Sequence, residues 1–243
     1  MGCDMGYTQI KENARFQFRQ RYGMCVGAAL LFLLLGGASN GFSFRFDSDS
    51  YYRIGRDLLP IIWGLVGFAS VLSIFVGGPM EVGYSDFCCR IYVGVEASVG
   101  GMFSTGFRRD YWRSVGGMLW MRLFIFLWSL LFIIPGIVKS YAYFATPYIL
   151  AEFPHVNATE ALKISMRMTD GYKGDIFVLG LTFIGWNILS AFTFGLLGIF
   201  YVNPYYYTAM AGMYQALKIN ALNNGAVRYE ELMGYMPPPP NYA

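Results

Sequence analysis

The chain has 243 residues, of which 56% are apolar, 19% are aromatic and only 14% are charged, with a formal net charge of +3. Ordinary soluble domains carry about 25% charged residues, so this composition excludes a soluble enzyme built around a single core. The small net charge and the lack of a zinc or recognition-helix motif also exclude nucleic acid as a partner. The apolar residues gather in long charge-free runs, which predicts an all-α, polytopic membrane protein.

Two charge-free runs lie in the first third of the chain. Between Arg21 and Arg45, and again between Asp57 and Glu81, there are 23 uncharged residues. A helix needs roughly 20 apolar residues to cross a hydrocarbon core about 30 Å thick. Each run therefore predicts one transmembrane helix. The alternative for the first run is a cleaved secretory signal, since Gly36-Gly37-Ala38 is a passable cleavage site, but its polar lead is long for a signal.

Two longer apolar regions follow, and each is predicted to form a hairpin. The region 115–150 is interrupted by Pro135-Gly136, which favours a tight reversal. The region 176–217 has 42 uncharged residues, and a single helix of that length would be about 63 Å long. The sequence thus predicts six transmembrane helices in all.

The distribution of Lys and Arg predicts the orientation. With six spans, thirteen basic residues lie on one side and four on the other, so the first side, with both termini, is predicted to be cytoplasmic. The thirteen are Lys11, Arg15, Arg19, Arg21, Arg90, Arg108, Arg109, Arg113, Lys163, Arg167, Lys173, Lys218 and Arg228. The other four are Arg45, Arg53, Arg56 and Lys139.

The six spans are predicted to arise from an internal repeat, used three times, of a basic interfacial helix followed by a hairpin. The basic segments are 18–22, 107–111 and 167–172. The returning span of each hairpin begins at a proline, namely Pro60, Pro135 or Pro204, because proline suits the first turn of a helix. Such repeats occur in transporters, but they also arise by simple duplication of a hairpin.

The third interfacial helix has the clearest signals. Asn157 and Glu160 stand at capping-box spacing. Apolar residues then recur at helical spacing on one face, and Glu160, Lys163 and Arg167 line the other. Such an amphipathic helix is predicted to lie on the inner leaflet, where each basic residue near anionic lipid contributes about 1 kcal/mol.

The second half of the chain resembles the bacterial integral membrane family catalogued as domain of unknown function 975. The resemblance is closest over 123–214, and its most distinctive block is FLWSLLFIIPGIVK at 126–139. Shorter matching pieces are SY at 140–141, PYIL at 147–150, SMRM at 165–168, FIGW at 183–186 and PY at 204–205. The resemblance implies a six-helix inner-membrane protein. The family has no agreed activity, so the resemblance implies no catalytic residues and no cofactor.

Four polar residues within the predicted spans are candidate ligand-binding residues: Arg122, Lys139, Asn187 and Asn203. An ionised side chain at the centre of a membrane helix costs about 2.5 to 3.5 kcal/mol, so Arg122 either faces the bundle interior or snorkels to the headgroups. Lys139 is predicted to lie near the outer interface as a topology anchor. The two asparagines either bridge helices or line a polar path.

The basic interfacial segments supply the predicted lipid-surface contacts, which are Arg108, Arg109, Arg113, Lys163 and Arg167. The sequence lacks a nucleophile elbow, a zinc-binding helix and a phosphate loop, and the predicted spans contain no acidic residue. We therefore expect a non-enzymatic inner-membrane protein, without cofactor or metal, for lipid-proximal binding, membrane-stress protection or support of a partner complex. The alternative is a small permease or exporter of an amphipathic compound.

The predicted partners are membrane lipids, together with a membrane protein or a second copy of the chain. Residues 1–230 are predicted to form the helical membrane domain and 231–243 a flexible, proline-rich cytoplasmic tail. The adjacent Cys88 and Cys89 are predicted to face the cytoplasm as small apolar residues at an interface, since no second pair completes a metal site.

Overall fold

The computed structural model describes residues 6–35, 59–109, 111–193 and 195–233, without the side chains of 34, 35, 59–74, 108, 109, 133 and 233. These residues form helices joined by turns, with no strand among them. The elements in chain order are α1 (Tyr7–Gln20), α2 (Tyr22–Leu35), α4 (Leu59–Val93), α5 (Val99–Phe103), the π-helix η2 (Ser104–Arg109), α6 (Tyr111–Leu131), α7 (Ile133–Ala142), α8 (Thr146–Glu152), α9 (Ala158–Met168), α10 (Lys173–Leu181), α11 (Ile184–Phe192), the π-helix η3 (Gly198–Val202), α12 (Asn203–Asn223) and α13 (Tyr229–Met233). The all-α prediction is thereby confirmed.

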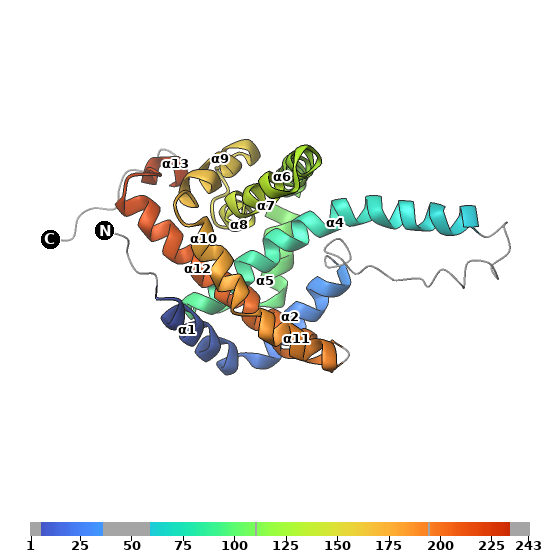
Figure 1. The fold of residues 1–243 in the computed structure, drawn as a ribbon, viewed down its shortest axis with the longest axis horizontal. Coiled ribbons are helices and arrows are strands. Elements are labelled where there is room, and N and C mark those ends of the chain that lie inside the picture. The colour runs from blue at the N-terminus through green and yellow to red at the C-terminus, as the bar shows by residue number, and fades with distance from the viewer. Residues whose placement is uncertain (1–5, 36–58, 110, 194, 234–243) are drawn as a thin grey trace.

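The core is built around α12, which runs diagonally across the body and contacts α1, α4 and η3 (Figure 1). Its long run of small and aromatic residues is buried on nearly every side, including Tyr214 and Leu217 at 0% exposure. Tyr214 stacks on Tyr148 of α8 with ring centroids 4.9 Å apart, and its hydroxyl donates to Glu152 at 2.7 Å. These contacts tie the C-terminal helix to the middle of the chain.

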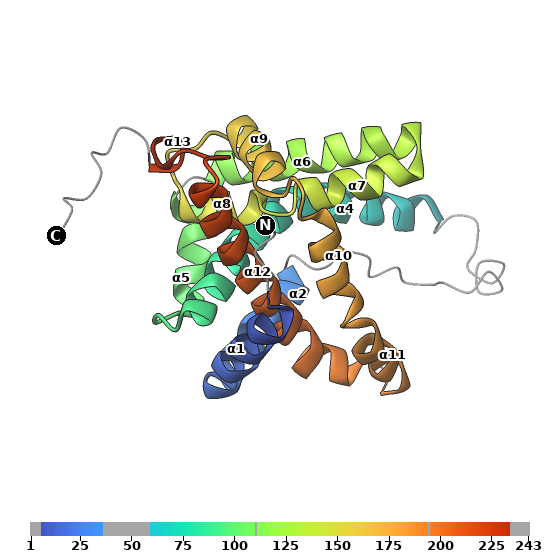
Figure 2. The same cartoon turned by 60° about the vertical axis from the view of Figure 1, so that its left-hand side comes forward.

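Two apolar hairpins project from this body: α6 returns through α7, and the α10–α11 segment returns through η3 and α12. In Figure 2 the α6–α7 pair and the α10–α11 segment lead away from α8, α9 and α13. Two stretches are long and apolar enough to cross a membrane, Tyr111–Leu131 and Lys173–Phe192, and Tyr22–Leu33 is a shorter apolar helix. The described residues thus support two candidate spans, and they do not support the six predicted from the sequence.

The fourth predicted span differs most from expectation. In its place, the chain forms α7, a turn at 143–145, and α8. The ten residues of α7 measure about 15 Å, half the thickness of a hydrocarbon core. All of Thr146–Ala151 in α8 is buried within the protein. Periodicity alone did not predict this break, because the sequence stays apolar through it.

Close approach of the two arms of each hairpin depends on a glycine facing a serine. A Cβ atom added to Gly136 of α7 would lie 2.8 Å from the Cα of Ser129 on α6. A Cβ at Gly198 of η3 would lie 2.5 Å from the Oγ of Ser190 on α11. The prolines are placed as predicted, since Pro60, Pro135 and Pro204 lie within the first turn of α4, α7 and α12.

The described residues do not show the predicted internal repeat, and the apolar faces of α1 and α9 are not free for lipid. In α1 the buried side chains are Ile10, Ala14 and Phe18, and α1 contacts α12 and α4. In α9 the predicted apolar positions are all buried, and the helix contacts α6 and α8. The prediction that the apolar face of α9 lies in the inner leaflet is therefore wrong, because protein covers that face.

Two further expectations change with the fold. The predicted domain boundary after residue 230 falls inside α13, whose Leu232 is only 2% exposed, and 234–243 lies outside the described residues. The long helix α4 continues past the predicted second span into the body, where Cys88 is buried. Burial raises the pKa of the Cys88 thiol. This thiol is consequently a poor target for labelling reagents.

Candidate functional site

A basic cleft lies where the α6–α7 hairpin meets α9 and the start of α10. It is a cavity of about 560 Å³ with four basic side chains and one acidic side chain in its wall. The lining residues are Val138, Lys139, Ala142, Lys163, Met166, Arg167, Asp170 and Lys173. The cleft therefore has the size of a small-molecule site and a surplus of positive charge.

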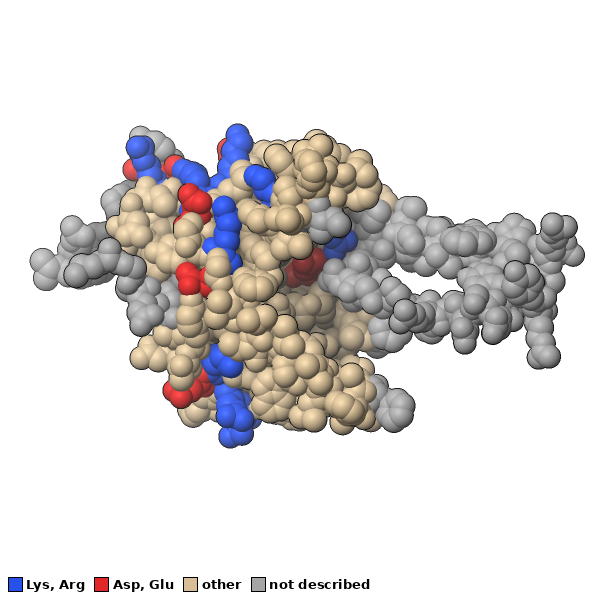
Figure 3. All heavy atoms as spheres, in the orientation of Figure 1, with Lys and Arg blue, Asp and Glu red and all other residues tan. Residues whose placement is uncertain are grey.

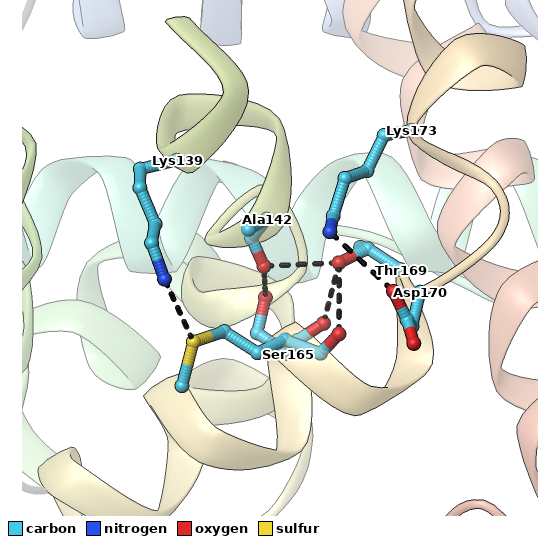
Figure 4. Close-up of polar contacts among 7 residues, drawn as sticks. Lys139, Ala142, Ser165, Thr169, Asp170 and Lys173 are labelled. Carbon is cyan, nitrogen blue, oxygen red and sulfur yellow. Dashed lines mark hydrogen bonds and ion pairs between the residues drawn. The ribbon is translucent and has the colours of Figure 1, made fainter. Parts of the chain in front are cut away.

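The capped start of α9 and a hydroxyl network at its end fix the walls of the cleft. At the start of α9 the Asn157 amide donates to Glu160 at 3.2 Å. At the other end, Ser165 and Thr169 both donate to the carbonyl of Ala142, at 2.9 and 3.1 Å (Figure 4). The Ala145 amide in turn donates to the Ser165 hydroxyl at 3.1 Å. These bonds satisfy the backbone groups that the break after α7 exposes. They hold α7 against α9.

The four cations of the cleft differ in their partners. Lys173 lies 3.5 Å from Asp170, and Arg167 forms an ion pair with Glu231 of α13. Lys139 lies over the rings of Trp128 and Tyr143, at 5.2 and 5.9 Å from their centroids. Its Nζ contacts the sulfur of Met166 at 3.8 Å (Figure 4).

Lys139 and Lys163 lack an acidic partner among the described residues. The positions of these lysines in one cleft also differ from the predicted topology. Lys139 was expected on the face opposite Lys163 and Arg167, but all three line one cavity. That expectation is wrong because α7 returns to the body after ten residues.

An apolar groove lies beside the cleft on the exposed surface of α6. It has a volume of about 530 Å³ and is lined by Phe124, Leu127, Trp128, Leu130 and Leu131. Because Trp128 also underlies Lys139, the groove and the cleft adjoin. The surface thus combines a cationic pocket with an apolar surface long enough for part of an acyl chain.

The remaining predicted lipid contacts are placed differently. The guanidinium of Arg113 donates to the backbone carbonyls of Leu150, Phe153 and Val156 at 2.7 to 3.0 Å. Its predicted role at the lipid surface is thereby replaced by a structural one, since these bonds fix the end of α8. Arg108 and Arg109 lie in η2, and their side chains lie outside the described residues.

Arg122 has an acidic partner that the sequence did not indicate. Its Nη2 lies 2.9 Å from Oε2 of Glu81 on α4. The sequence predicts that the second span ends at Glu81, but α4 continues for twelve more residues. Glu81 therefore lies in the interior of the helix and not at its end. The apolar positions beyond it, such as Val82, Phe87 and Ile91, were the available signal. Glu81 therefore belongs to the part of α4 beyond the predicted second span, and the absence of acidic residues from the predicted spans stays a prediction.

The two asparagines, which are predicted either to bridge helices or to line a polar path, lie beside the same cavity. Asn187 of α11 and Asn203 of α12 line one cavity of about 360 Å³, with Tyr141 of α7. Tyr206 and Tyr207 belong to the walls of this cavity and also to those of a second one, about 300 Å³, beside Glu81. Polar groups from four helices thus surround two adjoining cavities.

Among the residues described, no group of three or more His, Cys, Asp or Glu side chains is placed to hold a metal ion. Comparison with protein families finds one match, over residues 118–221, to a family described as a protein of unknown function (DUF975). The search of curated proteins and the search of solved structures find no match. The matched segment contains every residue that lines the basic cleft, and the α6–α7 hairpin from residue 118 onward.

Proposed function

From the membership of residues 118–221 in the DUF975 family, whose activity is unknown, we propose that this chain is a membrane protein that binds the phosphate headgroup of an anionic lipid in the basic cleft. The hairpins enter the bilayer, and the charged body with both termini lies at the cytoplasmic face of a bacterial inner membrane. The observation that carries the proposal is the position of the cleft at the foot of an exposed apolar hairpin.

Low burial of the apolar helices supports the membrane assignment. A soluble protein also contains apolar helices, but those lie mostly in its core. Here only 28% of the apolar window in Tyr111–Leu131 and 22% of that in Lys173–Phe192 is buried. Exposing two long apolar surfaces to water would cost about 25 cal/mol for each Å². A bilayer removes that cost.

The charge distribution supports the same orientation. On the face shown in Figure 3, charged side chains gather over the body, in the region of α1, α9, α10 and α12, whereas the surface over α6 and α11 is uncharged. Basic residues at the foot of membrane-inserted helices match the positive potential expected at a cytoplasmic interface.

A phosphate group suits the cleft better than a ligand without negative charge. Among the described residues Lys139 and Lys163 have no acidic partner, so their ammonium groups are available to an anion. The planar guanidinium of Arg167 also suits phosphate, which would compete there with Glu231. The adjoining groove on α6 accommodates the upper part of an acyl chain. Both halves of an anionic phospholipid therefore have a complementary surface.

Native mass spectrometry of the detergent-solubilised protein tests this proposal. We expect phosphatidylglycerol to bind more tightly than phosphatidylcholine with the same acyl chains. Lys139→Gln and Lys163→Gln are each expected to weaken phosphatidylglycerol binding about fivefold, since one basic residue near anionic lipid contributes about 1 kcal/mol.

Arg228→Gln is the matched control, because it removes one positive charge from an exposed site outside the cleft. Its affinity for phosphatidylglycerol should equal that of the unchanged protein. Equal binding of the two lipids, or equal loss in the control and the cleft variants, would contradict the proposal.

We propose that the chain acts without catalysis, as a lipid-binding or scaffold protein for a membrane partner or a second copy. A second candidate function, a small permease or exporter of an amphipathic compound, is supported by the two adjoining cavities at Tyr206 and Tyr207. Under that function, Arg122→Leu should abolish transport by reconstituted vesicles, because it leaves Glu81 without its cationic partner.

A further inference from the structure

A second polar centre lies in the interior, away from the basic cleft. Glu81 of α4 and Arg122 of α6 form an ion pair whose side chains are 23% and 28% exposed. Partly buried charges are costly unless they are paired, so this pair joins two helices that are otherwise apolar at this level. A group that both pays a desolvation cost and faces a cavity is a candidate binding group.

The cavity beside Glu81 has a volume of about 300 Å³, and half of its lining residues are aromatic. The aromatic lining residues are Phe32, Tyr84, Tyr143, Phe144, Tyr148, Tyr206 and Tyr207. They come from α2, α4, α8, α12 and the turn after α7. Helices far apart in the sequence thus converge on one small space.

Three of these rings are fixed against one another. Phe32 and Tyr84 stack with centroids 4.5 Å apart, and Tyr207 meets them edge-on at 5.6 and 5.1 Å. Such mutual packing restricts the rings to their observed orientations. The cavity wall is accordingly preorganised, so little ordering cost remains for a ligand that contacts it.

The charged and aromatic side chains of the cavity wall indicate which kind of ligand the cavity favours. Among the described residues, Glu81 is the charged side chain that lines the cavity, and Arg122 lies outside the lining set. The faces of aromatic rings carry negative potential and attract cations, and groups of such rings bind quaternary ammonium ions. A carboxylate together with tyrosine and phenylalanine rings therefore favours a positively charged organic group.

We infer that this cavity binds an organic cation, with its ammonium group beside Glu81 and its apolar part against the aromatic rings. Arg122 holds the carboxylate in place and competes with the cation for it. The inference does not depend on lipid binding in the basic cleft. It would give the second candidate function a substrate class, a cationic amphipathic amine.

Calorimetric titration of the detergent-solubilised protein tests the inference with benzyltrimethylammonium and its uncharged carbon isostere, neopentylbenzene. We expect the cation to bind at least tenfold more tightly than the isostere. Glu81→Gln should weaken cation binding at least tenfold. Glu96→Gln, which removes one negative charge from an exposed site, should leave it unchanged.

Two further variants separate recognition from folding. Arg122→Gln should tighten cation binding several-fold, because it removes the competing charge, whereas general damage to the fold would weaken it. The double variant Glu81→Gln/Arg122→Gln leaves neither ion of this pair and should lose most of the preference for the cation, since only the aromatic rings still favour it.

The aromatic wall has its own test. Tyr207→Phe, which keeps the ring, should retain cation binding, and Tyr207→Leu should weaken it. Equal binding of the cation and the isostere by the unchanged protein would overturn the inference. So would a double variant that still prefers the cation tenfold.

Discussion

At the scale of the residue, Arg113 shows how a basic side chain in an interfacial sequence serves the fold. Its guanidinium donates to three carbonyls at the end of α8, which is buried. Hydrogen bonds to charged groups contribute more than neutral ones, and carbonyls left without donors carry a further cost. Arg113 therefore stabilises the segment that replaces the fourth predicted span.

Arg113→Gln is expected to lower the free energy of unfolding by about 2–4 kcal/mol, since it removes three charge-assisted bonds, and of the three carbonyls that of Phe153 keeps a donor in the Val156 amide. Unfolding in mixed detergent micelles, followed by tryptophan fluorescence, measures this change. Arg228→Gln, at an exposed site, should change the same free energy by less than about 0.5 kcal/mol. An unchanged stability in Arg113→Gln together with weaker lipid binding would contradict the structural role.

Residue-scale predictions held where the interaction is local in sequence. Asn157 and Glu160 are three residues apart, and their capping contact is present in the structure. The partners of Arg113 and Arg122 lie 37 to 43 residues away from them, so spacing along the chain carries no information about them. An arginine within an apolar helix is predicted to need a partner from the sequence alone. Which residue becomes that partner depends on how the helices pack.

At the scale of the element, α9 shows the limit of amphipathicity as a signal. Its apolar positions were predicted correctly, and all are buried. The surface that covers them was not predictable, because a protein core and a lipid leaflet select the same residues. The opposite face carries Lys163 and Arg167 into the cleft, so the basic half of the pattern is the half that reaches a ligand.

The short helix α13 limits access to one of these cations. Glu231 forms an ion pair with Arg167, while Leu232 beside it anchors α13 in the body. Any anion that binds Arg167 must compete with this carboxylate. Under the proposed function, this contact would lower the affinity of the cleft for phosphate.

Glu231→Gln is therefore expected to strengthen phosphatidylglycerol binding about threefold to fivefold, because Arg167 becomes available to the phosphate. Native mass spectrometry with the same lipid pair measures the change. Glu230→Gln is the control, since it removes the same charge from the neighbouring exposed position. A variant at Glu231 that binds lipid no better than the control would show that α13 does not compete for Arg167.

At the scale of the whole molecule, the number of membrane crossings depends on how deeply each hairpin inserts. The sequence predicted three full hairpins from the length of apolar runs alone. Length was sufficient for the stretch Lys173–Phe192, but it was misleading for 133–150, where the returning apolar residues are divided between a short helix and a buried one. Apolar residues inside the protein and inside the bilayer look alike in a sequence.

The tip of the α6–α7 hairpin is itself apolar. Leu130, Leu131, Phe132 and Ile134 are 64–76% exposed, and no polar residue stands at the turn. A tip that reached water on the far side would expose these side chains there, at a cost of about 25 cal/mol for each Å². Pro135 also reduces the backbone donors of the turn by one. An end point within the hydrocarbon, after about 15 Å of α7, suits this tip better than a full crossing.

Cysteine labelling distinguishes the two depths. In a protein whose native cysteines are replaced, Ile134→Cys is expected to resist a membrane-impermeant maleimide both in intact cells and in inverted vesicles, because the tip ends inside the bilayer. His155→Cys and Arg228→Cys, both at exposed positions on the body, should react in inverted vesicles and not in intact cells. Reaction of Ile134→Cys in intact cells would instead establish that the α6–α7 hairpin crosses the bilayer completely. Reaction of His155→Cys and Arg228→Cys from opposite sides would contradict a single cytoplasmic body.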